Sequence, residues 1–125
     1  MYVLDTSAAI EILNNTPAGA KVKKAIGNAP FVISSITAFE VLAGTKEQER
    51  EKTFTLIENA ETLEFDKESA KISAKIAQQL KQRGKTINPL YTCIAGNAMK
   101  YNAELVTLDR DFERIPNLKA IIVKK

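Results

Sequence analysis

Short apolar runs alternate with longer amphipathic segments along the whole chain. The runs are rich in β-branched and aliphatic residues, and they predict buried strands over 1–5, 31–35, 61–65, 104–108 and 120–124. The segments between them carry apolar residues at helical spacing. They predict helices over 6–14, 18–27, 67–83 and 88–101, and a further helix that begins at Thr37 and continues through 45–60.

The clearest helical pattern, over 67–83, has a capping residue before it and a glycine after it. Asp66 is the predicted N-cap, and Gly84 ends the helix. Asn88 and Pro89 mark the start of the next helix as N-cap and first helical residue. The residues predicted to face inward are Ile72, Ile76 and Leu80 with Ala70, Ala74 and Ala77 beside them, and Phe54 and Ile57 in the charged stretch 45–60.

Strands separated by helices are typical of a mainly parallel sheet covered on both faces. We therefore expect an α/β fold, a three-layer α/β/α sandwich, formed by a single domain over 1–125. The N-terminus lacks the basic lead of a signal peptide, and no apolar run reaches the roughly 18 residues that span a bilayer. The pattern favours a soluble, cytoplasmic protein without a membrane partner.

Composition narrows the chemistry that is available. The chain has no histidine and a single cysteine, which excludes Ser-His and Cys-His pairs, a disulfide framework and Cys/His zinc sites. An enzyme of this composition depends on carboxylates, hydroxyls, amines or a metal held by oxygen. The net charge of +3 is compatible with a nucleic-acid partner, but charge alone favours a solvated surface. Its cations cluster at Lys21, Lys23 and Lys24, at Lys81, Arg83 and Lys85, and at Lys124 and Lys125.

Carboxylates follow the predicted strands. Asp5 comes directly after the first strand, Asp109 after 104–108 with Asp111 two residues later, and Glu40 lies in the first turn of the helix behind 31–35. In parallel sheets ligands bind at the carboxyl ends of the strands, so we expect these acids at one edge. An oxygen-only cluster of this kind favours Mg²⁺, with Mn²⁺ also compatible.

Each acid also has a structural interpretation. Asp5 fits an N-cap of the helix over 6–14, and Asp109 and Asp111 fit turn positions. Thr37 and Glu40 have the T-x-x-E spacing of a capping box, in which Glu40 would bond back to the backbone. Asp66 fits a cap and nothing else. The joint placement of the other four acids favours a metal site over four unrelated caps and turns.

At these residues the sequence resembles PIN domains, and among them the VapC-type toxin ribonucleases of prokaryotic toxin–antitoxin pairs. The resemblance covers the whole chain. The motifs that carry it are Asp5-Thr6-Ser7, the S-x-x-T-x-x-E pattern over 34–40, the segment INPLYTCIAGNA over 87–98, and LVTLDRDF over 105–112.

The resemblance implies a PIN-like fold and a metal-dependent endoribonuclease. It implies that Asp5, Glu40 and Asp109 are catalytic and bind Mg²⁺ (or Mn²⁺), that Asp111 adds charge, and that Thr6, Ser7 and Thr107 support the ligands. It also implies an RNA substrate, a homodimer and a small VapB-like antitoxin partner.

One position departs from the family pattern. The acid expected three residues before Ile94-Ala95 is Tyr91, and residues 85–96 contain no acid at all. A neutral phenol is a poor Mg²⁺ ligand, while Asn88 offers a neutral oxygen one turn away but also fits a cap. The alternative hypothesis is therefore a PIN scaffold that binds RNA or a protein without cleaving. A third hypothesis, a receiver-like signalling domain, lacks the phosphorylatable Asp after a middle strand.

Overall fold

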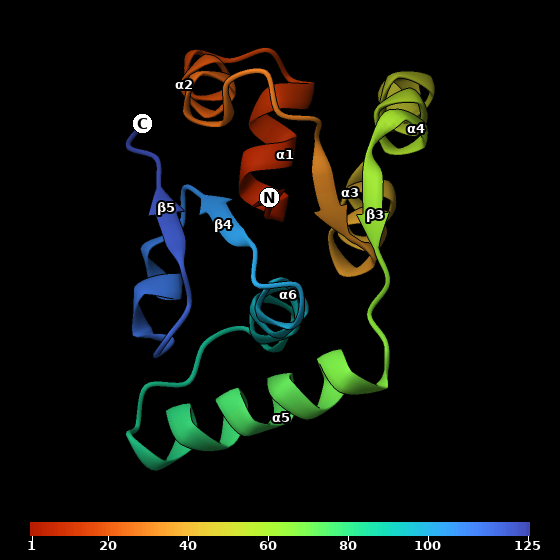
Figure 1. Ribbon diagram of the computed structural model, residues 1–125. Coiled ribbons are helices and arrows are strands. Elements are labelled where there is room, and N and C mark those ends of the chain that lie inside the picture. Colours follow the sequence, from red (N-terminus) through yellow and green to blue (C-terminus); the bar gives the residue numbers. More distant parts are fainter.

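The computed structural model of residues 1–125 contains one five-stranded sheet in which all strands are parallel (Figure 1). The strands are β1 Tyr2–Leu4, β2 Val32–Ser34, β3 Glu61–Leu63, β4 Glu104–Thr107 and β5 Ala120–Ile122. Their order across the sheet is β3-β2-β1-β4-β5, which places β1 in the centre. Receiver domains have the order 2-1-3-4-5, so the receiver hypothesis is wrong.

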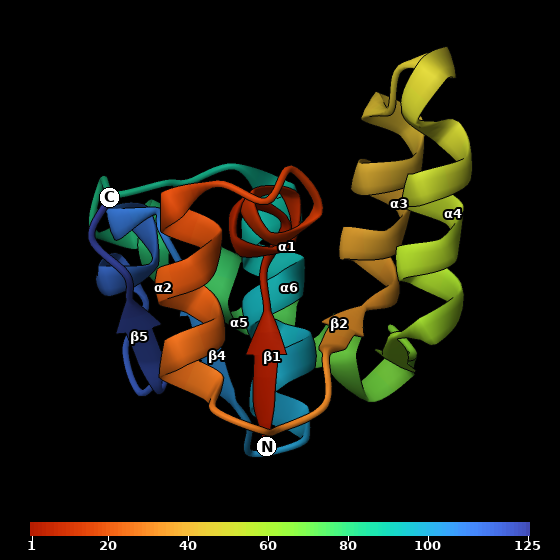
Figure 2. The same ribbon diagram turned by 90° about the horizontal axis from the view of Figure 1, so that it is seen from above.

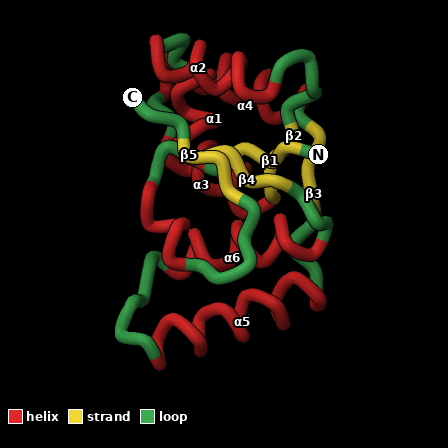
Figure 3. The backbone as a smooth tube through the Cα atoms, turned by 60° about the vertical axis from the view of Figure 1, so that its left-hand side comes forward, coloured by secondary structure: helices red, strands yellow, loops and turns green.

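Six α-helices and two short 3₁₀ helices connect the strands. They are α1 Thr6–Leu13, α2 Pro17–Ile26, α3 Ser35–Gly44, η1 Glu47–Glu49, α4 Arg50–Asn59, α5 Lys67–Gln82, α6 Pro89–Lys100 and η2 Arg110–Arg114. Figure 3 shows helical layers on both sides of the sheet, with α5 outermost beyond α6. The three-layer α/β/α sandwich is thus confirmed. Figure 2 shows α3 and α4 side by side beyond β2, and Figure 1 shows β3 leading away from α4.

Successive residues of each strand point to opposite faces of the sheet, and each face has its own core. Val3, Val32 and Leu105 belong to the cluster under α5 and α6, whereas their neighbours Leu4, Ile33 and Val106 belong to the cluster under α1 and α2. Strands with apolar residues at consecutive positions are expected in a sheet that is buried on both faces. This explains why the strand runs show no polar alternation.

The predicted helix from Thr37 through 60 is wrong in its boundaries. The helix α3 begins at Ser35, because the Ser34 hydroxyl caps it by accepting a hydrogen bond from the Ile36 backbone N–H at 3.1 Å. The chain then leaves the helix at Thr45 before α4 begins. Within α4, Ile57 packs against the core as predicted, but Phe54 points outward and is 56% exposed.

The helix α5 confirms its predicted cap but not its whole predicted face. Asp66 accepts a hydrogen bond from the Ser69 N–H at 2.9 Å, and Ile76 and Leu80 are buried. Ala70, Ala74 and Ala77 are exposed, and Ser69 and Ser73 are buried in their place. The reason is the close approach of α6: a methyl group on Gly96 would lie 2.0 Å from the Ser73 hydroxyl oxygen.

None of the helices combines the length and the hydropathy needed to span a bilayer. The parallel strands all end at the same edge of the sheet. Asp5 follows β1 directly, Asp109 lies two residues beyond β4, and Glu40 is carried by α3 immediately behind β2. The fold therefore brings the predicted acids to one edge, as the strand pattern indicated.

Candidate active site

Asp5 is the buried centre of the carboxyl edge. Its carboxylate is 1% exposed and accepts hydrogen bonds from the Ala8 backbone N–H at 2.9 Å, from the Ser7 hydroxyl at 2.8 and 3.0 Å, and from the Thr107 hydroxyl. The bond from Ala8 makes Asp5 the N-cap of α1. The cap interpretation is thus correct, but it accounts for only one of these three donors.

Burial raises the pKa of Asp5 from 3.8 to about 6. The hydrogen bonds from Thr107, Ala8 and Ser7 oppose this effect, and the nearby charge of Asp109 adds to it. Desolvation disfavours the charged form of a buried carboxylate, and a cation placed beside it favours that form again. The electrostatics of Asp5 therefore favour a metal or another positive group beside it.

Thr107, the last residue of β4, links Asp5 to Asp109. Its hydroxyl donates to Asp5 and accepts from the Asp109 backbone N–H at 3.0 Å. Ser7 links the same two strand ends, because its hydroxyl accepts from the Leu108 N–H at 3.1 Å while it donates to Asp5. The two hydroxyls set the relative position of the segments that carry the two aspartates.

Glu40 is held toward the site by α1 rather than by its own helix. The Thr6 hydroxyl donates to the Glu40 carboxylate at 2.6 Å and lies 3.3 Å from the Thr37 hydroxyl. The capping-box interpretation is wrong, because α3 begins before Thr37 and Thr37 is a buried helical residue. Glu40 is therefore available to the carboxyl edge.

Tyr91 lies at the start of α6, facing the carboxylates. Its ring stacks on that of Phe112, with centroids 5.1 Å apart and an interplanar angle of 21°. Burial, together with Asp109, raises the pKa of Tyr91 to about 12. The charges of Asp5 and Glu40 act in the same direction, so the phenol hydroxyl senses all three carboxylates and stays protonated at neutral pH.

Two other predicted residues, Asn88 and Asp111, lie at the margin of this group. Asn88 caps α6, because its side-chain oxygen accepts from the Leu90 N–H at 2.8 Å. Asp109 accepts from the Asp111 N–H at 2.9 Å, and the Asp111 carboxylate pairs with Arg114 at 3.5 Å. Asp109 is thus also a cap, of η2, while Asp111 is directed to a salt bridge within η2.

Two supporting residues were not predicted as parts of the site. Phe112 is 1% exposed and forms the platform under Tyr91, and Thr37 completes the hydroxyl chain from Thr6. Both lie inside motifs that were noted for their acids, LVTLDRDF and S-x-x-T-x-x-E. Their roles depend on contacts between distant segments, which spacing along the chain does not reveal.

The donor set is compatible with a hard cation but does not form a cage. No three acidic side chains converge closely enough to enclose an ion. A carboxylate has about four lone-pair positions, and Asp5 uses three of them for the Ala8, Ser7 and Thr107 donors, which leaves one for a metal. Mg²⁺ commonly takes one or two carboxylates and completes its octahedron with water and substrate phosphate. These residues fit that kind of site.

Comparisons with known proteins agree with this geometry. A family model described as "PIN domain" matches residues 2–118. The chain is 29% identical to the tRNA(fMet)-specific endonuclease VapC of Shigella flexneri over 94% of both chains. It also superposes on the crystal structure of VapBC2 from Rickettsia felis bound to a promoter DNA fragment, with a TM-score of 0.83, 26% identity and 98% of both chains covered. VapBC-1 of nontypeable Haemophilus influenzae gives a TM-score of 0.83 at 27% identity, covering 97% of this chain and 96% of that one.

Proposed function

The chain belongs to the PIN-domain family, and on that premise we propose that it is a metal-dependent endoribonuclease, the toxin of a type II toxin–antitoxin pair. The observation that carries the proposal is the buried Asp5 carboxylate, tied through Thr107 to Asp109 at the carboxyl edge of the sheet. The resemblance to VapC-type proteins supports the ribonuclease activity and a VapB-like antitoxin partner. A homodimer and a cytoplasmic location are part of the same proposal.

PIN-domain nucleases generally use divalent metal ions, and the oxygen-only donors here favour Mg²⁺, with Mn²⁺ as a substitute. In the proposed site Asp5 and Asp109 hold the ion, and Glu40 and Asp111 add negative charge. When bound, the metal supplies a nucleophilic water and a Lewis acid for the phosphodiester.

The chain's own residues prepare this site. The Ser7 and Thr107 hydroxyls orient the Asp5 carboxylate and leave one of its lone-pair positions without a protein donor. Thr6 of α1 holds the Glu40 carboxylate of α3 by a hydrogen bond. In this proposal Glu40 would accept the proton of the attacking water. The raised pKa of Asp5 falls when a cation is beside it, so the carboxylate is ionised when it is needed as a ligand.

The hypothesis of a PIN scaffold that binds without cleaving is the weaker alternative, because Tyr91 is the only observation that supports it. The resemblance to named endonucleases favours cleavage. A protonated phenol can still donate a hydrogen bond to Asp109 or to a substrate phosphate oxygen. The variant Tyr91→Asp separates the two functions: the scaffold hypothesis requires an inert native chain and an active variant, whereas similar cleavage by both excludes it.

The test of the proposal is cleavage of RNA by the purified chain with Mg²⁺ or Mn²⁺, compared with Asp5→Asn. The matched control is Asp66→Asn, which alters the N-cap aspartate of α5; its hydrogen-bond partners are Ser69 and Lys100, neither of which belongs to the candidate site. We expect cleavage by the native chain and the control and at least a hundredfold loss in Asp5→Asn, in the range seen when one group of an active site is removed. Equal cleavage by all three chains would assign the activity to a contaminant and refute the proposal.

A further inference from the structure

Two adjoining hollows lead away from the candidate active site along the β4–β5 side of the edge. The first has a volume of about 340 Å³, and Ser7 and Asp109 of the site form part of its lining. The second has a volume of about 610 Å³ and shares Leu108, Arg110 and Lys125 with the first. Because the linings overlap, the two hollows form one continuous groove, which we call the β5 groove.

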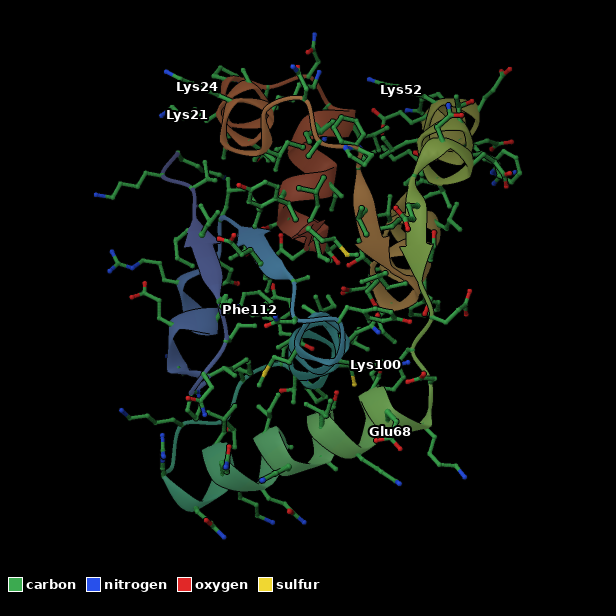
Figure 4. All side chains as sticks on the ribbon, in the orientation of Figure 1. Lys21, Lys24, Lys52, Glu68, Lys100 and Phe112 are labelled. Atoms are coloured by element: carbon green, nitrogen blue, oxygen red, sulfur yellow. The ribbon has the colours of Figure 1, made fainter.

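The far half of the β5 groove is basic. It is lined by Arg110, Lys124 and Lys125, and its one acidic residue is Glu113. The Lys21 ammonium donates to the Lys124 carbonyl oxygen at 3.2 Å, which brings this lysine of α2 to the outer end of the groove. Figure 4 shows Lys21 and Lys24 projecting outward beside the C-terminal segment.

The acids along the groove do not neutralise it permanently. Glu113 pairs with Arg110 at 2.9 Å and Glu11 with Lys125 at 3.6 Å, and both lysine and arginine side chains are more than three-quarters exposed. Exposed ion pairs such as Arg110–Glu113 are weak, so a phosphate can displace that carboxylate, whereas the Glu11 side chain beside Lys125 is only 18% exposed. Lys124 takes part in no ion pair and is free to bind an anion.

The opposite side of the site has a different character. A hollow of about 280 Å³ meets the β5 groove at Ile10, and its charged lining is Glu40, Glu49 and Lys46. This hollow carries more negative than positive groups. A polyanion that reaches the carboxylates is therefore attracted from the β5 side and repelled from the α3 side.

We propose that the β5 groove binds the phosphate backbone of the substrate RNA on one side of the bond that is cleaved. Lys124 and Lys125 contact phosphates in the far half, and Arg110 contacts the phosphate next to the site. This inference rests on the proposed function, because it names where the substrate of that same site lies. Backbone contacts by lysine and arginine position a nucleic acid without reading its sequence, so the groove determines affinity and register rather than sequence preference.

The experiment compares the native chain with Lys124→Ala/Lys125→Ala, and with Lys71→Ala/Lys75→Ala on the exposed face of α5 as a matched control. The probe is a 5′-labelled 20-nucleotide single-stranded RNA, and its Kd is measured by fluorescence anisotropy in EDTA, so that no cleavage occurs. For single strands each lost phosphate contact removes about 0.7 from the slope of log K against log salt concentration. The groove variant should therefore lose about 1.4 in slope, which makes its deficit about sevenfold larger at 50 mM than at 200 mM salt.

With Mg²⁺ present, the groove variant should cleave the same RNA with a raised KM and an unchanged kcat. Kd values and slopes identical in all three chains, or a native chain that does not bind the RNA, would overturn the inference. So would a loss of affinity for the antitoxin alone, which would assign the groove to an acidic antitoxin segment. If RNA binding depended on the two lysines but no RNA were cleaved, the inference would stand and the proposed nuclease activity would fail. If RNA were cleaved but binding were the same in the groove variant, the nuclease activity would stand and the inference would fail.

Discussion

The variant Asp5→Asn measures how much stability the fold loses by holding a charged carboxylate in its interior. The substitution is nearly isosteric, and asparagine caps helices as well as aspartate does, so the hydrogen bond from Ala8 to the capping oxygen is retained. Thr107 accepts a hydrogen bond as well as donating one, so it can accommodate the new amide. The main difference between the two chains is therefore the charge of a residue that is 1% exposed.

The magnitude follows from the pKa. The pKa of Asp5 rises from 3.8 to about 6, mainly because the carboxylate is buried. Between these two pH values the folded state holds a proton that the unfolded state releases. The contribution of Asp5 to stability is therefore fully present below pH 3.8 and is lost as the pH rises through about 6. At about 1.36 kcal/mol per pH unit, the native chain is less stable at pH 7 by about 3 kcal/mol than it would be with a neutral side chain. We expect Asp5→Asn to gain up to that amount.

The assay is urea unfolding in EDTA at pH 4 and at pH 7. The free energy of unfolding of Asp5→Asn should exceed that of the native chain by about 3 kcal/mol at pH 7 and by only about 0.5 kcal/mol at pH 4, and the Tm at pH 7 should rise by roughly 10 °C. Added Mn²⁺ should stabilise the native chain and not the variant, because only the native chain provides the charged ligand.

Asp66→Asn is the control with the opposite sign. The hydrogen bond to Lys100 holds the pKa of Asp66 at about 2, below its ordinary 3.8. A lowered pKa stabilises the fold above pH 3.8 and loses that effect as the pH falls through 2, so Asp66→Asn should be less stable than the native chain at pH 7. If Asp5→Asn were no more stable than the native chain at pH 7, or if its gain were the same at pH 4, the reasoning about a desolvated charge at Asp5 would be refuted.

Three further predictions concern the surroundings of the site. Tyr91→Asp adds a carboxylate near three others, so the metal-free variant should bind Mn²⁺ more tightly than the native chain does, as measured by calorimetry. Equal affinities of the two chains would show that position 91 does not face the ion. Thr107→Val removes the hydroxyl bonded to Asp5, and should raise the pKa of Asp5 further, seen by NMR titration, and cost about 1–3 kcal/mol of stability in urea. Gly96→Ala places a methyl group 2.0 Å from the Ser73 hydroxyl oxygen and should lower the free energy of unfolding by about 1–3 kcal/mol. The control Gly44→Ala places its methyl group where nothing lies within 4 Å, so it should not lower that free energy. Equal effects of the two variants would contradict the close packing of α5 on α6.

The local signals in the sequence were sufficient for the fold class. The apolar runs identified all five strands, and the caps at Asp66 and Asn88 marked two helices correctly, because a cap depends on hydrogen bonds within three residues. The spacing of Asp5, Glu40 and Asp109 behind three strands placed them at one edge of the sheet, since all parallel strands end there. These features depend on neighbours along the chain and on one rule of sheet topology.

Only the tertiary structure decided which side chains from distant segments contact each other. The T-x-x-E spacing left open the interpretation that Glu40 bonds to its own helix, but Glu40 accepts from Thr6, which is 34 residues away in the sequence. Helical periodicity placed alanines on the inner face of α5, but the close approach of Gly96 requires a face of serines that fit against α6. Phe54 was predicted inward by its apolar character, yet α4 is a peripheral helix and has no core behind that position. Sequence determines which elements form and where their polar ends lie, whereas close packing between distant segments determines which side chains meet.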